Sequence, residues 1–350
     1  MKTPDCAWRL ADLKDVPQNG IKVMSTFACG GGSSMGYKRA GCSIVAANDI
    51  DPEMAWHYKR NINPPNYYLC PIRDLLTMDL PPELFKLDIL DGSPPCSTFS
   101  MAGSREKAWG KDKHFREGQA KQVLSDLFFD YLDLVERLKP KVAIAENVKG
   151  MILGNAKGYT KMVMARFKEI GYRPQLFLLN AADCGVPQRR ERVFFCAIRE
   201  DIKVQPLKLS PKHRWISAGE ATADLQDLTP EEKKDTAPTE SDLNWWPKTS
   251  QGSDYGVAAL KAKGSPTGFS IKRLAANKTS NTLPASEVIR HWSECRKLTF
   301  REWKRLGSFP DDYHAKTDKI GKYMIGMSVP PKMTEVVARA VIDQWLQPKP

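Results

Sequence analysis

Short apolar runs alternate with amphipathic stretches over the first two hundred residues. We predict buried strands in the apolar runs, at 21–27, 42–47, 87–90, 142–145, 175–179 and 192–198. Between them, apolar side chains recur with helical spacing, which predicts helices at 33–40, 52–61, 119–138 and 159–170. Strands that alternate with helices of this length are typical of a parallel, doubly wound α/β sheet.

The periodic pattern weakens after about residue 200. Residues 219–243 carry eight acidic and two basic side chains, whereas 244–305 carry twelve basic and four acidic ones, with tryptophans between them. Helical spacing returns at Thr299, and 331–346 predicts a C-terminal helix. We therefore predict a main α/β domain over 1–200, completed by 296–350, and a smaller, loop-rich domain over 201–295.

Composition and charge narrow the function classes. The chain has 350 residues, 41% of them hydrophobic, and a formal net charge of +12, which favours a polyanionic partner. The longest apolar run, Val193–Ile198, is far too short to span a membrane. The N-terminus carries charges where a signal peptide needs apolar residues, so we expect a cytoplasmic protein. The eight cysteines form no C-x-x-C pair, and we expect no metal site.

A glycine cluster follows the first predicted strand. Gly30, Gly31 and Gly32 precede a predicted helix, an arrangement that lets a ligand approach backbone amides closely. Asp49 and Asp51 come at the end of the next strand, about 20 residues on, where such folds usually bind a ribose. Glycines after strands are more often simple turns, but the spacing to the acidic strand end favours a nucleotide-like cofactor.

A cysteine lies directly after another strand. In Gly92-Ser-Pro-Pro-Cys96 the Pro-Pro pair places the Cys96 thiol rigidly at the carboxyl edge of the sheet, where open α/β sheets bind ligands. A lone cysteine is usually inert packing, but the polar neighbours Ser97 and Thr98 argue against burial. Residues 101–118 are rich in glycine and basic side chains, which suits either a mobile lid over a phosphate backbone or a solvated loop.

Two further charged positions adjoin buried strands. Glu146 ends the strand at 142–145, so it is either an ion-paired structural residue or a carboxyl group with a raised pKa that can carry a proton. Gln188-Arg-Arg-Glu-Arg192 comes just before the strand at 192–198. On charge alone, this second run is more simply a solvated surface.

Taken in order, these motifs resemble those of the DNA (cytosine-5)-methyltransferase family. The resemblance covers 21–346 and rests on six motifs: Phe27-Ala-Cys-Gly-Gly-Gly32, Pro95-Cys96, Glu146-Asn-Val148, Gln188-Arg-Arg-Glu-Arg192, Arg296-Lys-Leu-Thr299 with Phe309-Pro-Asp-Asp-Tyr313, and Gly326-Met-Ser-Val-Pro-Pro331. The resemblance implies a Rossmann-like fold that binds S-adenosyl-L-methionine and releases S-adenosyl-L-homocysteine. The domain over 1–200 with 296–350 would then be catalytic, and 201–295 would recognise the target.

The resemblance also implies roles for individual residues. Cys96 would attack C6 of a flipped-out cytosine, Glu146 would bind its N3/N4 edge, and Arg192 with Arg190 would hold the O2 side. The residues expected to bind the cofactor are Phe27, Ala28, Gly30, Gly31, Gly32, Asp49, Ile50, Ile72, Pro94, Ser328 and Val329. The residues expected to contact DNA are Ser97, Arg105, Lys107, Lys111, Lys113, Thr282 and Arg296.

Several positions depart from the family pattern. Cys29 stands where the family usually has glycine, and Pro71-Ile72 falls where an Asp-Ile pair commonly contacts adenine. Met327 replaces an asparagine near the cofactor, Asp49 is shorter than the usual glutamate, and Ser97 follows the nucleophile in place of glutamine. Most of these departures fall at positions expected to lie near the cofactor, whereas Cys96, Glu146 and Arg192 match the family.

The expected substrate is double-stranded DNA, acted on by a monomer of bacterial or phage origin. A cognate restriction endonuclease in the same system is a further expected partner. Two alternatives stay open: an RNA methyltransferase acting on tRNA, since one branch of the family does so, and a DNA-binding relative with impaired turnover.

Overall fold

The computed structural model describes residues 4–95, 127–154, 156–265 and 271–347, and the backbone of two short strands, β5 (Asp112–Lys113) and β6 (Gln122–Val123). The chain divides by its internal contacts into two compact units. The sheet unit consists of Leu13–Asn180, Glu191–Pro211 and Met333–Pro350. The insert unit consists of Met1–Asp12, Ala181–Arg190 and Lys212–Lys332.

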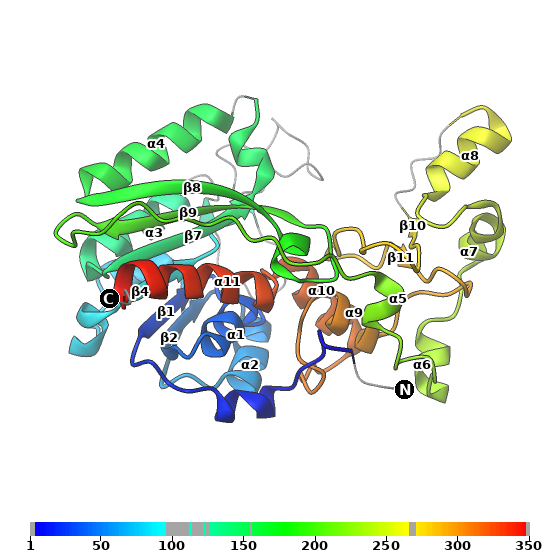
Figure 1. Ribbon diagram of the computed structural model, residues 1–350, viewed down its shortest axis with the longest axis horizontal. Coiled ribbons are helices and arrows are strands. Elements are labelled where there is room, and N and C mark those ends of the chain that lie inside the picture. The colour runs from blue at the N-terminus through cyan, green and yellow to red at the C-terminus, as the bar shows by residue number, and fades with distance from the viewer. Residues whose placement is uncertain are drawn as a thin grey trace. The chain divides into compact units, whose positions relative to one another are not determined.

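The sheet unit contains a seven-stranded sheet in the order β3-β2-β1-β4-β7-β9-β8 (Figure 1). The strands are β1 (Lys22–Thr26), β2 (Ser43–Asp49), β3 (Asn66–Leu69), β4 (Ile89–Gly92), β7 (Val142–Val148), β8 (Tyr172–Asn180) and β9 (Glu191–Arg199). The mixed sheet confirms the predicted α/β fold class. Strand β3 was not predicted, because its half-exposed Asn-Tyr-Tyr-Leu sequence forms no apolar run.

The direction of β9 corrects the expectation of a wholly parallel sheet. Strands β1, β2, β3, β4 and β7 pair in parallel, but β9 is antiparallel to both β7 and β8. Only residues 181–190 connect β8 to β9, and they contain a single 3₁₀ turn, Ala181–Cys184. A parallel neighbour needs a longer crossover, so the chain reverses and β9 enters the gap between β7 and β8.

Five helices belong largely to the sheet unit: α1 (Gly32–Arg39), α2 (Pro52–Asn61), α3 (Leu127–Leu138), α4 (Ala156–Glu169) and α11 (Pro331–Val341). Helix α2 matches its predicted span because the Asp51 side chain accepts hydrogen bonds from the backbone N–H groups of Glu53 and Met54, with Pro52 at the first position. The predicted helix at 119–138 is wrong over Gln122–Val123, which pair with β5 instead. Helix α11 continues into a π-helical turn, Ile342–Leu346.

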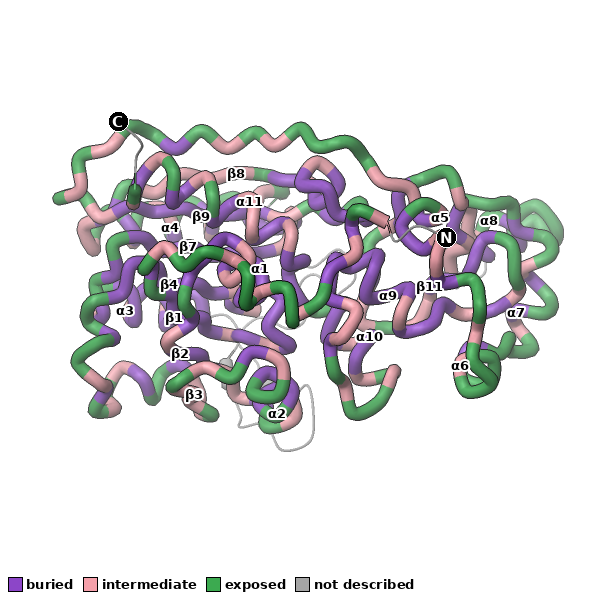
Figure 2. The backbone as a smooth tube through the Cα atoms, turned by 60° about the horizontal axis from the view of Figure 1, so that its bottom comes forward, coloured by how far each residue is buried: buried purple, intermediate pink, exposed green. Residues whose placement is uncertain are grey.

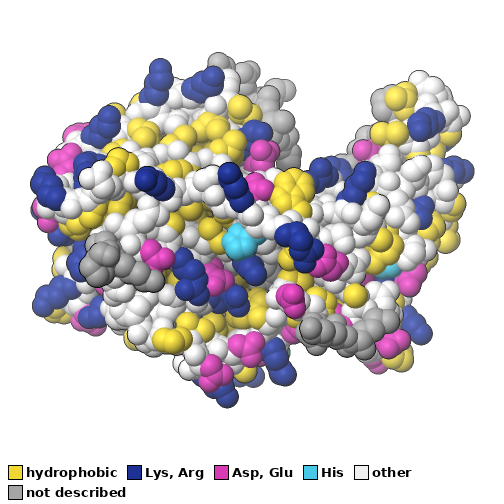
Figure 3. Space-filling model, in the orientation of Figure 1, with side chains coloured by type: hydrophobic (Ala, Val, Ile, Leu, Met, Phe, Trp, Pro, Cys, Tyr) yellow, Lys and Arg dark blue, Asp and Glu magenta, His cyan; other side chains and the backbone are white. Residues whose placement is uncertain are grey.

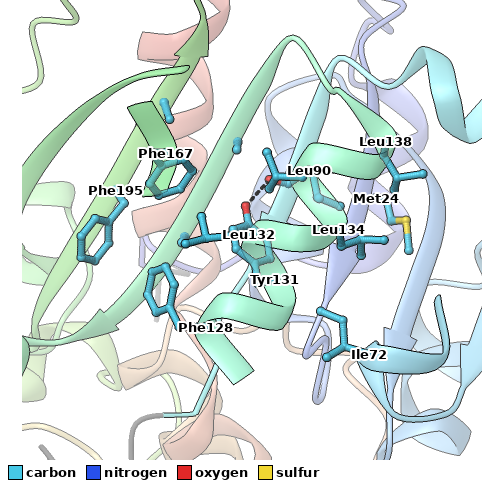
Figure 4. Packing of buried hydrophobic residues seen from close by; sticks show 14 of the residues in the cluster. Met24, Ile72, Leu90, Phe128, Tyr131, Leu132, Leu134, Leu138, Phe167 and Phe195 are labelled. Atoms are coloured by element: carbon cyan, nitrogen blue, oxygen red, sulfur yellow. Dashed lines mark hydrogen bonds between the residues drawn. The ribbon is translucent and has the colours of Figure 1, made fainter. Parts of the chain in front are cut away.

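Both faces of the central strands β1, β4, β7 and β9 are mostly buried, and most of their residues have the buried colour in Figure 2. Along β9, Val193, Phe195 and Ala197 belong to a large apolar cluster, whereas the alternating Phe194 and Cys196 are buried outside it. Helix α3 fills the cluster with Phe128, Tyr131, Leu132 and Leu134, and Figure 4 shows Phe128 and Leu132 on the side of Phe195 and Phe167, and Leu134 on the side of Met24. The Tyr131 hydroxyl donates to the carbonyl oxygens of Leu90 and Ile144, so it fixes α3 against β4 and β7.

The insert unit is built from short elements joined by turns. They are α5 (Ala218–Ala221), α6 (Pro230–Asp235), α7 (Glu240–Trp245), α8 (Tyr255–Lys263), β10 (Lys272–Arg273), β11 (Ile289–Arg290), α9 (Phe300–Leu306) and α10 (Asp318–Met327). The contact division places 296–332 with the segment 212–295, whereas we had grouped 296–350 with the main α/β domain. Among the described residues, no helix is long and apolar enough to cross a membrane.

Candidate functional site

The glycine loop joins β1 to α1 through a strained backbone. Phe27, Cys29 and Gly31 all have positive φ angles, of 52°, 45° and 84°. A Cβ atom at Gly31 would also lie 2.9 Å from Cγ1 of Ile62, so only glycine fits there without a shift. The loop therefore turns sharply at the carboxyl end of β1, where we predicted that Phe27, Ala28, Gly30, Gly31 and Gly32 bind the cofactor.

Asp49 ties this loop to the end of β2. Its Oδ2 accepts a hydrogen bond from the Cys29 N–H at 2.7 Å, and its Oδ1 accepts one from the Asp51 N–H at 3.0 Å. Burial raises the pKa of Asp49 above its ordinary value, although these backbone donors oppose that rise. A carboxylate offers about four lone-pair sites, so Asp49 retains acceptor capacity for a ligand hydroxyl. Ile50, the next predicted cofactor residue, is half-buried.

The other predicted cofactor residues lie in different surroundings. Ile72 is buried in the apolar cluster of the sheet unit, as Figure 4 shows, so its side chain contributes to the core. Pro94 is buried at the end of β4, and Val329 is buried in the insert unit. The Ser328 Oγ is also buried, and it has no hydrogen-bond partner within the described part of the chain. A buried hydroxyl without a partner is costly, so Ser328 suits a polar ligand.

Glu146 and Arg192 form a buried ion pair across β7 and β9. The Arg192 Nε lies 2.8 Å from the Glu146 Oε1, and both side chains are mostly buried. Strand register explains the pair, because Arg192 faces Val148, two residues along β7 from Glu146 and on the same face of the sheet. Burial lowers the pKa of Arg192, while the charge of Glu146 raises it. The ion pair considered for Glu146 is thus present in the structure.

Asn147 is a site residue that the sequence motif contained but to which we gave no role. Its side chain points to the other face of β7, and its Nδ2 donates to the Pro94 carbonyl at 3.0 Å. This bond holds the end of β4 just before Pro95 and Cys96. The period-2 alternation of β7 is the signal that separates the two roles, because Glu146 and Asn147 must face opposite ways.

Arg190 occupies different surroundings from Arg192, although only two residues separate them. Its guanidinium is buried in the insert unit and donates to the carbonyl oxygens of Leu283 and Gly326 at 3.1 and 3.0 Å. Gln188 is also buried, and its Oε1 accepts from the Leu283 N–H. Both contacts indicate a structural role for the first half of the motif. Gln188 and Arg190 are buried on either side of the exposed Arg189, so the alternation of side-chain direction was the signal that could have indicated this role.

Arg296, which we expected to contact DNA, is held by carboxylates of its own chain. Its guanidinium is buried, and Nη1 and Nη2 donate to the two carboxylate oxygens of Glu302 at 2.8 and 2.9 Å. The Nε donates to Glu294, so all three nitrogens are engaged within the chain. Thr282 is exposed, and its hydroxyl donates to the Arg189 carbonyl.

The remaining predicted residues lie outside the described part of the chain. They are Cys96, Ser97, Arg105, Lys107 and Lys111; the backbone of Lys113 lies in β5, and its side chain is not described. Among the basic residues of 244–305, Lys248, Lys261, Lys263 and Lys278 are exposed. On the face of the molecule that Figure 3 draws, acidic side chains lie among the basic ones, and the basic side chains do not form one continuous patch.

The sheet and its loop are those of a Rossmann-like methyltransferase, in which the last strand enters the sheet antiparallel to its neighbours. The family described as C-5 cytosine-specific DNA methylase matches residues 21–343. The chain therefore belongs to this family of cytosine-5 DNA methyltransferases. Within the described residues no cluster of His, Cys, Asp and Glu could hold a metal ion.

Relatives of known sequence and structure agree with this assignment. The chain is 28% identical to the Type II methyltransferase M.NgoPII of Neisseria gonorrhoeae, with 92% of this chain and 96% of the relative covered. It is 34% identical to M.FnuDI of Fusobacterium nucleatum, but that match spans only 55% of this chain and 53% of the relative. A mutant of DNMT2 from Spodoptera frugiperda has a similar fold, with a TM-score of 0.65, 17% identity, and 92% of this chain and 100% of that one covered.

Proposed function

We propose that this protein transfers a methyl group from S-adenosylmethionine to C5 of a cytosine flipped out of double-stranded DNA. The observation that carries the proposal is the buried Glu146–Arg192 pair at the carboxyl edge of the sheet. A carboxylate and a guanidinium side by side offer an acceptor and several donors within one small area, as the polar edge of a pyrimidine requires. Asn147 ties this edge to Pro94, two residues before Cys96.

The proposed chemistry divides into roles for three side chains. The Cys96 thiolate forms a bond to C6 while N3 takes up a proton. Glu146 binds the protonated N3 and the N4 amino group, and Arg192 donates to O2. C5 then attacks the methyl group that S-adenosylmethionine supplies when bound. Loss of the C5 proton to a solvent base restores the ring double bond and expels the Cys96 thiolate. Removing the base from the stack costs a few kcal/mol.

The cofactor would be held by the residues that the motifs indicate. In the sheet unit, the loop from Phe27 to Gly32 turns tightly with positive φ angles, and Asp49 retains acceptor sites for ribose hydroxyls. In the insert unit, the buried Ser328 hydroxyl has no hydrogen-bond partner among the described residues. Each of these features suits a nucleoside ligand. Arg190 is retained in this proposal as a positioning residue, since it binds the carbonyl oxygens of Leu283 and Gly326.

We further propose that the protein works in the cytoplasm as a monomer, beside a restriction endonuclease of the same specificity. The Type II methyltransferase names of its relatives support this pairing. The catalytic domain would be 1–200 with 296–350, and 201–295 would recognise the target, with the exposed lysines of that region contacting phosphates.

The proposal is tested by mapping methylated cytosines after expression in a methylation-free host, then building a duplex with 5-fluorocytosine at the mapped position. The wild type should form a denaturation-resistant adduct that depends on S-adenosylmethionine. Cys96→Ser should form none, whereas the control Cys70→Ser, at a partly exposed cysteine of the sheet unit, should retain it. An adduct with Cys96→Ser would refute the nucleophile. Methylation of tRNA with none of DNA would refute the substrate.

The polar pair has its own test. Glu146→Gln should lower the methylation rate by about 10²-fold or more, because the ring loses its charged partner. The control is Glu191→Gln, which removes an exposed carboxylate paired with Lys149 one residue from Arg192. Equal rates in both variants would refute the role of Glu146.

A further inference from the structure

Tyr67 lies on β3 beside the glycine loop. Strand β3 runs parallel to β2, with Tyr67 opposite Ala47 and Leu69 opposite Asp49. Alternate residues of a strand point to the same face of the sheet, so the Tyr67 and Asp49 side chains share a face. The Tyr67 ring packs on Tyr58 of α2, with ring centres 5.4 Å apart, and the Lys59 ammonium lies 5.1 Å from its centre.

The Tyr67 hydroxyl is buried and has no hydrogen-bond partner among the residues that the structure describes. Other buried tyrosines each have one: Tyr37 donates to Asp91, Tyr58 bonds to Ser34, Tyr131 donates to Leu90, Tyr172 donates to Pro140 and Tyr255 donates to Asp242. A buried hydroxyl without a partner costs about 1–3 kcal/mol. Among the described residues, Tyr67 is therefore an exception, because the other buried tyrosine hydroxyls named here have partners.

Groups of the glycine loop and of the end of β2 act on the Tyr67 hydroxyl. Burial raises its pKa well above the ordinary value, and Asp49 is the charged group that raises it most, with smaller contributions from Tyr58, Cys29 and Asp51. The phenol is thus a neutral donor close to the Asp49 carboxylate but not bonded to it. Within the described part of the chain, Asp49 accepts hydrogen bonds from backbone N–H groups, those of Cys29 and Asp51 among them. A hydroxyl group between them could donate to Asp49 and accept from Tyr67.

We propose that Tyr67 is a binding residue for the ribose of the adenosyl cofactor, donating its phenolic hydrogen to a ribose hydroxyl that in turn donates to Asp49. This inference rests on the proposed function, because it needs an adenosyl ligand at the glycine loop. Tyr58 is unsuited to the role, since its own hydroxyl lies 2.5 Å from the Ser34 Oγ. Tyr67 provides the unsatisfied donor that a ribose hydroxyl would satisfy.

The test measures binding of S-adenosylhomocysteine by calorimetry, without DNA and without turnover. Tyr67→Phe should weaken binding by about 5- to 10-fold, the loss expected for one hydrogen bond. The melting temperature of the ligand-free protein should not fall, because no protein contact is lost. The control Tyr172→Phe removes the bond to the Pro140 carbonyl, so it should lower the melting temperature and leave binding unchanged.

Deoxy analogues of the ligand give the sharper measurement. The wild type should bind the 2′-deoxy or the 3′-deoxy analogue more weakly than the parent, and Tyr67→Phe should lose that discrimination for the same analogue. If the wild type binds S-adenosylhomocysteine and Tyr67→Phe binds it equally well, the role of Tyr67 is refuted. If the wild type does not bind it, the proposed function itself fails, and this inference with it.

Discussion

The interiors of the sheet unit and the insert unit differ in how they accommodate charge. The sheet unit has a large apolar cluster drawn from its central strands and from α3 and α4, with the fully buried Phe195 among its members. The insert unit also buries apolar side chains, such as Trp245, Tyr255 and Trp303. It adds deeply buried ion pairs, of which Arg290 with Asp242 is the most buried among the described residues. The insert unit therefore combines apolar burial with charge pairing in its interior.

The ion pairs of the insert unit coincide with its helix starts. Three helices begin with a capping threonine and an acid three residues later: Thr229 with Glu232 in α6, Thr239 with Asp242 in α7, and Thr299 with Glu302 in α9. Each acid also pairs with an arginine: Arg301, Arg290 and Arg296 respectively. Helices of six or seven residues are not stable alone. The same carboxylates therefore start the helices and connect them to the rest of the unit.

The largest effect should follow from breaking the most buried of these pairs. Asp242→Ala should destabilise the insert unit by about 3–5 kcal/mol, because it leaves the Arg290 guanidinium buried without its partner. Hydrogen exchange should show lost protection within 212–332 and little change in the sheet unit. The control Glu220→Ala breaks the exposed pair with Arg214 and should have no measurable effect.

A double variant sharpens this prediction. Asp242→Leu combined with Arg290→Met should recover most of the lost stability, since apolar residues of similar volume often replace a buried pair without loss. A double variant as unstable as Asp242→Ala would show that the geometry of the pair, and not its charge balance, holds the unit together.

A nearly equal loss should follow from opening the core of the sheet unit. Phe195 is fully buried and lies edge-on to Phe128, with ring centres 5.2 Å apart. Phe195→Ala should cost about 3–4 kcal/mol from lost burial and a residual cavity. Urea unfolding measures the loss, and exchange should localise it to 127–180. Equal loss of protection in the insert unit would contradict the independence of the two interiors.

Asp91 provides a third comparison, because this buried acid of the sheet unit is held by hydroxyl groups. Its two oxygens accept from Ser25 and Tyr37, and burial raises its pKa to about 7. In contrast, although burial opposes it, the bond from Arg290 holds the pKa of Asp242 below its ordinary value. Asp91 thus takes up a proton on folding below pH 7, whereas Asp242 remains charged.

Stability against pH should therefore separate wild type from Asp91→Asn. The folded protein binds a proton at Asp91 more tightly than the unfolded chain does, so this contribution is full below pH 4 and is lost as pH rises toward 7. Relative to the variant, the wild type should gain about 1.4 kcal/mol for each unit that pH falls between 7 and 4. Urea unfolding at pH 5, 6, 7 and 8 measures the trend, and a gain with rising pH would contradict it.

The smallest effect should come from the most exposed of the three capping acids. Glu232→Ala removes the acidic half of the capping box of α6 and a pair with the half-exposed Arg301. We expect a loss of about 1 kcal/mol, confined to the start of α6. Glu231→Ala, at the neighbouring exposed position, is the matched control in the same exchange experiment. Equal losses in the two variants would show that the capping contact adds nothing.

The sequence predicted the central strands and α2 well, because their signals are local. An apolar run marks β7 and β9, and Asp51-Pro52 starts α2 with its own capping side chain. Strand β3 and the direction of β9 escaped prediction, since both depend on which strand lies alongside. Pairing partners are a property of the folded sheet and leave no mark within a single strand.

The same distinction between local signals and contacts made only in the fold applies to the residues of the candidate site. Glu146 and Arg192 were identifiable from their motifs, and the structure pairs them. Arg296 and Tyr67 were not, because a basic or phenolic side chain looks alike in sequence whether it faces solvent, a carboxylate or a ligand. Only the fold shows that Glu302 meets Arg296 and that Tyr67 lies beside Asp49.

The charge asymmetry along 219–305 has a consequence for how target recognition can change. Three ion pairs are nested along the chain: Asp224 with Arg305, Glu232 with Arg301, and Asp242 with Arg290. The acids come first along the chain and the arginines follow, so these ion pairs join residues 224–242 to residues 290–305. Residues 243–289 lie in sequence between the two partners of the innermost pair. We therefore expect that lengthening, shortening or exchanging this segment changes the free energy of loop closure only slightly, because the closure entropy depends on the logarithm of loop length.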